Sequence, residues 1–382
     1  MLVSLIGTWI QTVAQSWLVF QLTNSAFLLG VVAFLNSVPV FFLSLFGGVA
    51  ADRMNKRNIL IVTQSAFMVL AFFLAILTHL KLITPFQIML IAVLNGIVLA
   101  FDAPARQSMV VELVGKKHLL NAIALNSAAF NSSRIIGPAF AGILIATIGM
   151  SGCFYINGIS FFAVLLALLS IRVNNLSKNG AQGHTLSDMK AGLQIIKNDR
   201  LIMALIMMVG IVSLFGVSYV ILMPIFASGV LGVGVKGLGM LMSSAGIGAL
   251  LAALILARLG DFRHKGKLLF CSSYVFSFSL ILFSLSKSYP LSLAALMFTG
   301  WSSVTAVSLI NALLQTAVSD EFRGRVMSFF MLTFAGLMPF GNLLAGALSQ
   351  AWGVSPVVML SGVICLIFFT MINLTYPQIR KI

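Results

Sequence analysis

Charged side chains are scarce in this sequence of 382 residues. Only 8% of them are Asp, Glu, Lys or Arg, whereas these residues make up about a quarter of a typical soluble domain. Hydrophobic residues account for 60% of the chain, and the mean hydropathy is +1.09. This composition excludes an ordinary soluble protein and predicts that a lipid bilayer surrounds most of the chain.

Acidic residues are the rarest charged type. There are eight of them against 23 Lys and Arg, which gives a formal net charge of +15. A protein that reads nucleic acid needs a basic face on a water-soluble scaffold, but here the charges fall in short segments between apolar runs. We therefore expect no nucleic-acid partner. The expected partners are the bilayer and a small-molecule substrate, with the chain acting as a monomer.

Reactive and metal-binding patterns are also missing. The three cysteines lie far apart without metal-ligand spacing, and the four histidines fall in predicted loops or at helix ends. The sequence contains neither a His-Glu-x-x-His pattern nor a Gly-x-x-x-x-Gly-Lys-Ser/Thr loop,. We therefore expect no metal site, no catalytic residues and no ATP-driven pump, and no cofactor other than an ion gradient.

Apolar runs of membrane-spanning length dominate what is present. We count twelve, which predicts an all-α membrane protein with twelve transmembrane helices. The first run has no positive leader and no cleavage pattern, so we interpret it as a span and not as a signal peptide; so short a first span is compatible with a native start upstream of Met1. The predicted spans are 2–20, 26–50, 59–77, 86–101, 121–148, 154–171, 201–227, 238–257, 268–285, 291–314, 326–350 and 356–374.

The basic residues fall mainly on one side of these spans. Nineteen of the 23 lie in alternate loops or in the C-terminal tail. The opposite loops hold only Lys81, Lys236 and Lys287, and Arg134 lies within a span. The positive-inside rule then predicts that both termini are cytoplasmic.

The longest polar interval divides the chain into two halves. It predicts a six-helix bundle over 1–171, a cytoplasmic linker over 172–200 and a second bundle over 201–382. The linker is either a solvated tether or carries a short amphipathic helix on the membrane surface. Gly96, Gly137 and Gly142 each have a matching glycine 204 residues later, which favours an internal repeat.

The loop between the second and third spans carries a motif. It contains Gly48, then Asp52 and Arg53, then Lys56 and Arg57, in the run GGVAADRMNKR. This run resembles the signature loop of the major facilitator superfamily, with Asn55 in place of the second glycine. The resemblance implies the major facilitator fold, two six-helix bundles that give alternating access.

Three further stretches extend the resemblance over the whole chain. Gly137, Pro138 and Gly142 resemble the helix-five motif of drug/proton antiporters. The runs FDAPARQ at 101–107 and RGRVMS at 323–328 resemble the branch that contains the enterobactin exporter and macrolide efflux proteins. That branch implies export of a small molecule across the cytoplasmic (inner) membrane.

The resemblance also implies a conformational latch on the cytoplasmic side. Asp52 would meet the N-terminus of the helix that starts near Arg325, where the helix dipole favours a carboxylate, and Lys56 would pair with Asp102. The alternative is that these charges only set the topology. The expected latch residues are Gly48, Asp52, Arg53, Lys56, Arg57, Asp102 and Arg325.

Arg134 is the one charge deep in a span, which makes it a candidate functional residue. It shares a helix face with Ser127, Asn131 and Pro138, so it either attracts an anionic group or holds neighbouring helices together. Other intramembrane polar residues are candidates for cavity walls, although helix packing explains any one of them equally well. The expected cavity residues are Gln11, Gln15, Asn36, Asn95, Asn131, Arg134, Trp301 and Thr305.

These features predict a secondary transporter and not an enzyme. Coupling by proton antiport is expected, with Asp102 as the best proton carrier because no carboxylate lies at mid-membrane. Arg134 favours an anionic, siderophore-like cargo. A multidrug or macrolide exporter is the alternative, and a nutrient importer or channel is a further one.

Overall fold

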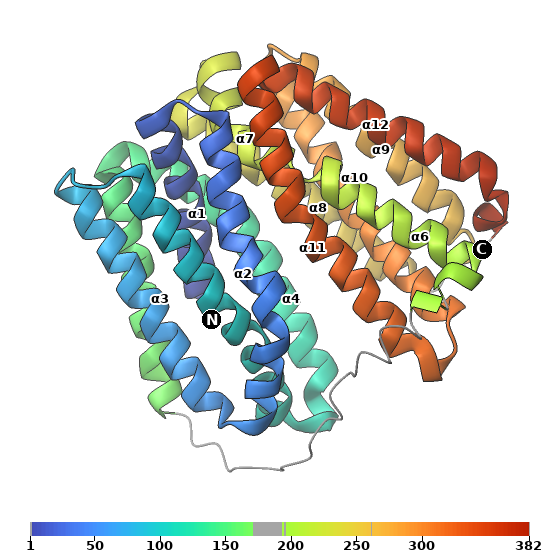
Figure 1. The fold of residues 1–382 in the computed structure, drawn as a ribbon, viewed down its shortest axis with the longest axis horizontal. Coiled ribbons are helices and arrows are strands. Elements are labelled where there is room, and N and C mark those ends of the chain that lie inside the picture. The colour runs from blue at the N-terminus through green and yellow to red at the C-terminus, as the bar shows by residue number, and fades with distance from the viewer. Residues whose placement is uncertain (1, 171–192, 195, 261, 382) are drawn as a thin grey trace. The chain divides into compact units, whose positions relative to one another are not determined.

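A computed structural model describes residues 2–170, 193–194, 196–260 and 262–381, and the regular elements in these ranges are all helices (Figure 1). Contacts between residues divide the chain into two units. Unit 1 comprises 1–183 and 234–243, and unit 2 comprises 184–233 and 244–382. Most of the expected linker, namely 171–192 and 195, lies outside the described residues.

Besides the segment 234–243, unit 1 contains four helical elements. Two glycines break the last of them, because Gly115 has a φ of 65° and Gly149 a φ of 75°, values that only glycine adopts at little cost. The four elements are α1 (Leu2–Thr23), α2 (Ala26–Arg53), α3 (Lys56–His79) and α4 (Pro85–Ser170).

Element α4 passes along α3 more than once. Glu112 forms an ion pair with Lys56 at the start of α3. The Tyr155 ring then contacts His79 at the other end of α3, with centroids 6.4 Å apart. The Leu168 carbonyl lies back at the start of α3, where Arg57 donates to it. The chain therefore crosses this unit three times between Pro85 and Ser170, in agreement with the fourth, fifth and sixth predicted spans.

Unit 2 begins with an interrupted helix at the seventh predicted span. Two π-helical stretches break it, and Pro224 lies between them, where it removes a backbone donor. Its parts are α6 (Arg200–Ile211), η1 (Val212–Gly216), α7 (Tyr219–Ile225) and η2 (Phe226–Val230). The remaining elements are α8 (Gly234–Leu259), α9 (Lys265–Leu285), α10 (Tyr289–Ala317), α11 (Asp320–Trp352), α12 (Val354–Thr375) and η3 (Pro377–Lys381).

The described helices are long and apolar enough to cross a bilayer. Eleven runs in the described ranges meet this condition, and one of them, Leu125–Ser170, has 46 residues. At 1.5 Å per residue that run is about 69 Å long, roughly twice the thickness of a hydrocarbon core. It turns at Gly149 and makes two of the crossings described above. The spans thus occupy the twelve predicted segments, with most ends shifted by a few residues. The fourth span, predicted to end at residue 101, continues to Gly115.

Large apolar side chains cover the outside of the helices. Phe42, Phe46 and Leu125 are 63%, 62% and 74% exposed, and many Leu, Ile and Phe side chains resemble them. In water such a surface would cause aggregation. In a bilayer it is the surface that faces lipid, which agrees with the hydropathy of the sequence.

Glycines spaced 204 residues apart make equivalent close contacts in the two units. A Cβ on Gly96 of α4 would lie 2.2 Å from the Asn36 carbonyl oxygen of α2. A Cβ on Gly300 of α10 would lie 1.9 Å from the Ala245 carbonyl oxygen of α8. In both units a glycine therefore lets the fourth helix touch the backbone of the second.

Two more pairs of glycines 204 residues apart make equivalent contacts in the two units. Gly137 packs against Trp9 of α1, and Gly341 packs against the Leu214 carbonyl of η1, so the fifth helix approaches the first in each unit. Gly158 and Gly362 likewise bring the sixth helix against the third, at Phe72 and Ile281. This agreement of spacing and contact supports an internal repeat.

Candidate transport cavity

Side chains of unit 1 line a cavity of about 460 Å³. Ten of its 18 lining residues carry an amide or a hydroxyl, and one carboxylate and one guanidinium contribute charge. Four of the cavity residues expected from the sequence, namely Gln11, Gln15, Asn36 and Asn95, line it. The complete lining is Ser4, Leu5, Thr8, Gln11, Thr12, Gln15, Asn36, Phe67, Asn95, Leu99, Asp102, Ala103, Arg106, Gln107, Asn126, Phe130, Asn157 and Phe161.

Gln11 is held in the cavity wall by the last segment of α4. Asn157 donates from Nδ2 to Gln11 Oε1 at 2.7 Å, and Ser160 donates to Asn157 Oδ1 at 3.1 Å. A Cβ on Gly7 would lie 2.6 Å from Asn157 Oδ1. Glycine at position 7 thus allows α1 to approach closely enough for this amide pair, which satisfies polar groups that lipid could not.

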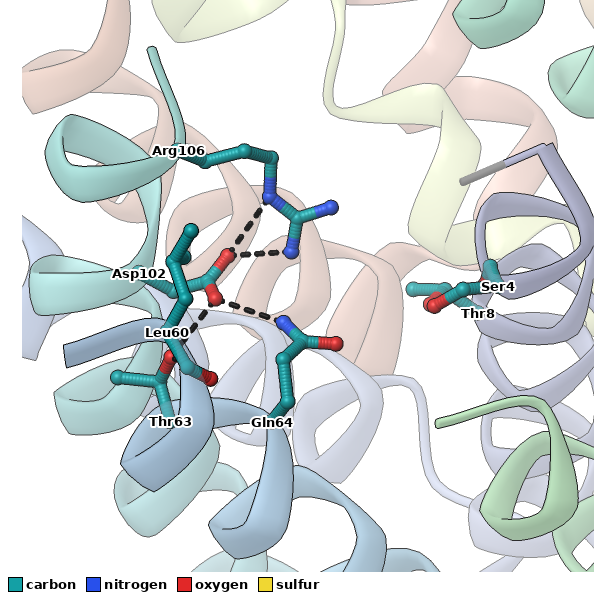
Figure 2. Close-up of polar contacts among 7 residues, drawn as sticks. All are labelled: Ser4, Thr8, Leu60, Thr63, Gln64, Asp102 and Arg106. Atoms are coloured by element: carbon teal, nitrogen blue, oxygen red, sulfur yellow. Dashed lines mark hydrogen bonds and ion pairs between the residues drawn. The ribbon is translucent and has the colours of Figure 1, made fainter. Parts of the chain in front are cut away.

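Asp102 is the buried charge of the cavity, and only 1% of it is exposed. Thr63 Oγ1 donates to Asp102 Oδ1 at 2.9 Å, and Gln64 Nε2 donates to the same oxygen at 2.7 Å. Arg106 donates to Oδ2 from Nε at 3.1 Å and also from Nη2 (Figure 2). The carboxylate thus has a donor set that offsets the loss of water.

The helix geometry explains how these groups meet. Asp102 and Arg106 are four residues apart in α4, so they share a face. Thr63 and Gln64 come from α3, which runs antiparallel to this part of α4. The Arg106 side chain is 27% exposed, against 2% for Asp102. The buried partner is therefore the acid, and the base reaches into the cavity.

The expected ion pair of Lys56 with Asp102 is wrong. Lys56 pairs instead with Glu112, one turn before the break at Gly115. Asp102 lies beside Thr63, seven residues along α3 from Lys56, which is about 10 Å along the helix axis. Because the two segments are antiparallel, Lys56 at the start of α3 meets Glu112, which lies ten residues beyond Asp102 in α4.

Arg57 also acts inside unit 1. It donates from Nε to the Leu168 carbonyl at 2.7 Å and from Nη2 to the Leu169 carbonyl at 2.9 Å. These carbonyls lie in the last turn of α4 that the structure describes, which ends at Ser170. The basic end of the signature loop therefore fastens α3 to the end of α4.

The other expected latch residues at the end of α2 are exposed or make no close contact. Asp52 and Arg53 are exposed at the end of α2. A Cβ on Gly48 would meet no atom within 4 Å, whereas a Cβ on Gly47 would lie 2.0 Å from the Ala100 carbonyl oxygen. The close-contact glycine of this loop is thus Gly47.

Arg325 lies at the start of α11, where its guanidinium is 5.5 Å from the Phe322 ring centroid. The expected contact of Asp52 with the start of α11 would lie between the two units, and it stays a prediction.

The remaining expected cavity residues lie elsewhere. Arg134 and Asn131 are half-buried and do not belong to the cavity lining, and Asn131 donates to the Ser127 carbonyl of its own helix at 2.8 Å. In unit 2, Thr305 is buried and donates to the Trp301 carbonyl at 2.8 Å. These residues therefore do not help to form the cavity of unit 1.

The helix-five motif makes close backbone contacts. A Cβ on Gly142 would lie 2.9 Å from the Val235 carbonyl oxygen. A Cβ on Gly239 would lie 2.4 Å from the Pro138 carbonyl oxygen. Both contacts belong to unit 1, which includes 234–243. The small residues of the motif thus act in helix packing.

Sequence reasoning missed the partners of Asp102 and Gln11, namely Thr63, Gln64, Arg106 and Asn157. It also missed the polar lining residues Ser4, Thr12, Gln107 and Asn126. Two signals were available. Gln64 and Asn157 are amides within apolar runs, where an unpaired polar group is costly. Arg106 follows Asp102 by four residues, the spacing of a helical ion pair. The choice of partner across helices, however, required the tertiary structure.

Comparison with known proteins decides the family. The sequence matches the family described as transmembrane secretion effector over residues 1–381. The chain belongs to this family. The transmembrane secretion effectors are part of the major facilitator superfamily, so the chain is a multi-pass transporter of the cytoplasmic membrane and not an enzyme.

Several curated relatives are similar along most of their length. The staphyloferrin A transporter of Staphylococcus aureus is 28% identical, with 94% of this chain and 90% of the relative covered. The multidrug efflux pump Tap of Mycolicibacterium fortuitum is 24% identical (91% and 87% covered). The enterobactin exporter EntS of Shigella boydii is 23% identical (85% and 77% covered). The relatives therefore include siderophore transporters and a drug pump.

Solved structures agree in fold. A bacterial homologue of the human lysosomal transporter Spinster, inward-facing and occupied, gives a TM-score of 0.76 at 15% identity, with 99% of this chain and 96% of that chain covered. A D-xylose-proton symporter gives 0.72 at 13% identity, with 96% and 95% covered. At these identities the likeness shows the fold alone.

Proposed function

We propose that this transmembrane secretion effector exports a polar small molecule of the siderophore class from the cytoplasm by alternating access, in exchange for protons. In this proposal both termini lie in the cytoplasm, as the positive-inside rule predicts. The similarity to the staphyloferrin A transporter and to the enterobactin exporter supports this cargo class.

The observation that carries the proposal is the set of polar side chains in the wall of the unit 1 cavity. Amides and hydroxyls line it beside the Asp102–Arg106 pair. Such a wall suits a cargo with many hydrogen-bonding groups, because buried polar groups need partners. Arg106 is the cavity residue that would attract an acidic group of the cargo.

Asp102 is the candidate proton carrier. It is buried, it lines the cavity, and it can accept a proton in place of the Arg106 interaction. Glu112 is paired with Lys56 and does not line the cavity. Asp102 is therefore the acid in unit 1 that both the cargo and a proton would reach from one cavity.

A multidrug exporter is the second candidate. The drug pump Tap is a relative, and Phe67, Phe130 and Phe161 give the cavity aromatic surface. Aromatic side chains suit bulky apolar or cationic drugs. This candidate predicts that cargo affinity depends on these rings more than on Arg106.

Efflux from loaded cells tests the two candidates. Cells that express the native chain or Arg106→Gln are loaded with a labelled catecholate siderophore or a cationic macrolide, with and without a protonophore. We expect siderophore efflux that the protonophore stops and that Arg106→Gln lowers at least about tenfold, because a charge-assisted contact is lost.

The competing results are distinct. Macrolide efflux that Arg106→Gln leaves unchanged would favour the multidrug candidate. Efflux that persists with the protonophore would contradict proton coupling. Accumulation in place of efflux would reverse the direction of transport.

A further inference from the structure

One buried acceptor beside Asp102 has no partner. Gln64 donates to Asp102 through Nε2, but its Oε1 forms no hydrogen bond within the described structure although it is buried. Figure 2 shows this oxygen turned away from Asp102, toward the side of α1 that carries Ser4 and Thr8, two residues of the cavity lining. A buried acceptor without a donor is costly, and a ligand with a donor would remove that cost.

Arg106 presents donors in the same place. Its Nε and Nη2 both bind Oδ2 of Asp102, and the third nitrogen of the guanidinium points away from the carboxylate (Figure 2). A guanidinium has five N–H donors in a planar fork that matches a carboxylate. The site thus combines donors on Arg106 with acceptors on Asp102 and Gln64.

We propose that Asp102, Arg106 and Gln64 form a subsite for an acidic group with a hydroxyl or amine on the neighbouring carbon. The acid binds Arg106, and the neighbouring group takes the place of Arg106 beside Asp102. There an ammonium donates to both Asp102 Oδ2 and Gln64 Oε1, whereas a hydroxyl shares its one hydrogen between these two oxygens. The cargo thereby replaces the internal ion pair with two new interactions. This inference rests on the proposed export function and narrows its substrate class to α-hydroxy and α-amino acids and larger molecules that contain them.

The same exchange makes cargo and proton compete. The ionised Asp102 carboxylate accepts a stronger hydrogen bond from the hydroxyl or amine than the protonated carboxyl, which has lost its charge and carries a donor on one oxygen. The groups that contact the Asp102 carboxylate are Arg106 from α4 and the neutral Thr63 and Gln64 from α3; on the α1 side Ser4 and Thr8 are neutral as well. Protonation of Asp102 therefore weakens its bond to the donor group of the cargo, which is the competition that antiport requires.

A pair of small probes tests the subsite without any substitution. Lactate and propionate carry the same carboxylate and differ by one hydroxyl. On the purified full-length chain in detergent, titration calorimetry at millimolar concentrations should show lactate binding at least about tenfold tighter, the ratio for one hydrogen bond to a charged group. Equal affinities, or binding of neither acid, would overturn the proposal.

Substitutions test the roles of Gln64 and Arg106 in the subsite separately. Gln64→Leu should reduce the preference for lactate severalfold and leave propionate binding as it was, whereas Arg106→Gln should weaken both acids at least about tenfold. Glu112→Gln is the matched control, because it removes a carboxylate of the same helix that is paired outside the cavity. A lactate preference that survives in Gln64→Leu would contradict the role of Oε1.

The pH dependence tests the exchange with a proton. Lactate binding to the native chain should weaken as the pH is lowered, and Asp102→Asn should remove most of that pH dependence. Equal pH dependence in both proteins would overturn the exchange step. These are equilibrium measurements without a membrane gradient, so they can succeed or fail separately from the efflux experiment.

Discussion

The two units follow one helical plan but use polar residues differently. Unit 1 holds a cavity of about 460 Å³ with a buried carboxylate that binds side chains of two helices. In unit 2, Ser273 and Ser277 of α9 are buried and donate to the Leu269 and Ser273 carbonyls of their own helix, at 2.8 and 3.0 Å. The pocket beside Leu214 in unit 2 has about 20 Å³.

The difference shows which polar residues can shape a site in lipid. A serine or threonine satisfies its hydroxyl on the preceding turn, so it can be buried without a neighbour. A carboxylate, a guanidinium or a primary amide has more groups to satisfy than its own helix offers. Such residues must find partners on other helices, and together they form the polar cavity of unit 1.

The largest expected effect concerns the repeat that both units share. We expect Gly96→Ala and Gly300→Ala each to destabilise the chain by about 3 kcal/mol or more, because a methyl group would overlap a carbonyl of the adjacent helix,. Thermal unfolding of the purified variants measures this. Gly48→Ala is the control, since its added methyl meets no atom within 4 Å. A large loss in one unit only would break the equivalence of the repeats.

The effect of intermediate size distinguishes a buried carboxylate that binds other side chains from a buried hydroxyl that binds its own helix. We expect Asp102→Asn to lower stability by about 1–3 kcal/mol, because the donors of Thr63, Gln64 and Arg106 lose a buried charged acceptor,. Ser277→Ala, which removes a self-satisfied hydroxyl of α9, should change it by less than about 1 kcal/mol. Chemical denaturation of both variants measures the two losses in the free energy of unfolding, and equal losses would contradict this distinction.

The smallest expected effect lies at the signature loop. Arg57→Lys keeps the charge but loses the planar fork that reaches two carbonyls,. We expect a loss of about 0.5–1 kcal/mol, typical of a helix-end contact. Hydrogen exchange of the amides near Leu168 should rise in this variant, and Lys81→Arg in an exposed loop serves as the comparison. Unchanged protection would show that Arg57 does not fasten this helix end.

Much of the fold was predictable because hydropathy alone limits it. A helix satisfies its own backbone in lipid, so each long apolar run predicted one span, and α9 begins and ends within a few residues of the predicted segment 268–285. The break at Gly149 also follows from local sequence, since a positive φ favours glycine,. The interruptions in the seventh helix were missed, because only Pro224 signals them.

The candidate site was predictable only in part. Gln11, Gln15, Asn36 and Asn95 were expected in a cavity and line one, because polar residues in apolar runs have few other uses. Arg134 was also expected in a cavity, but it is not among the residues that line the cavity of unit 1, and its role stays a prediction. A helix face can be read from spacing, but which neighbour that face meets depends on how the helices are arranged.

The sequence by itself determined the solvent, the spans and the repeat, since these depend on composition and local periodicity. The tertiary structure decided the partners. Lys56 meets Glu112 and not Asp102, while Asp102 meets Thr63, Gln64 and Arg106. The reason is geometric, because the register of two antiparallel helices fixes which side chains face each other.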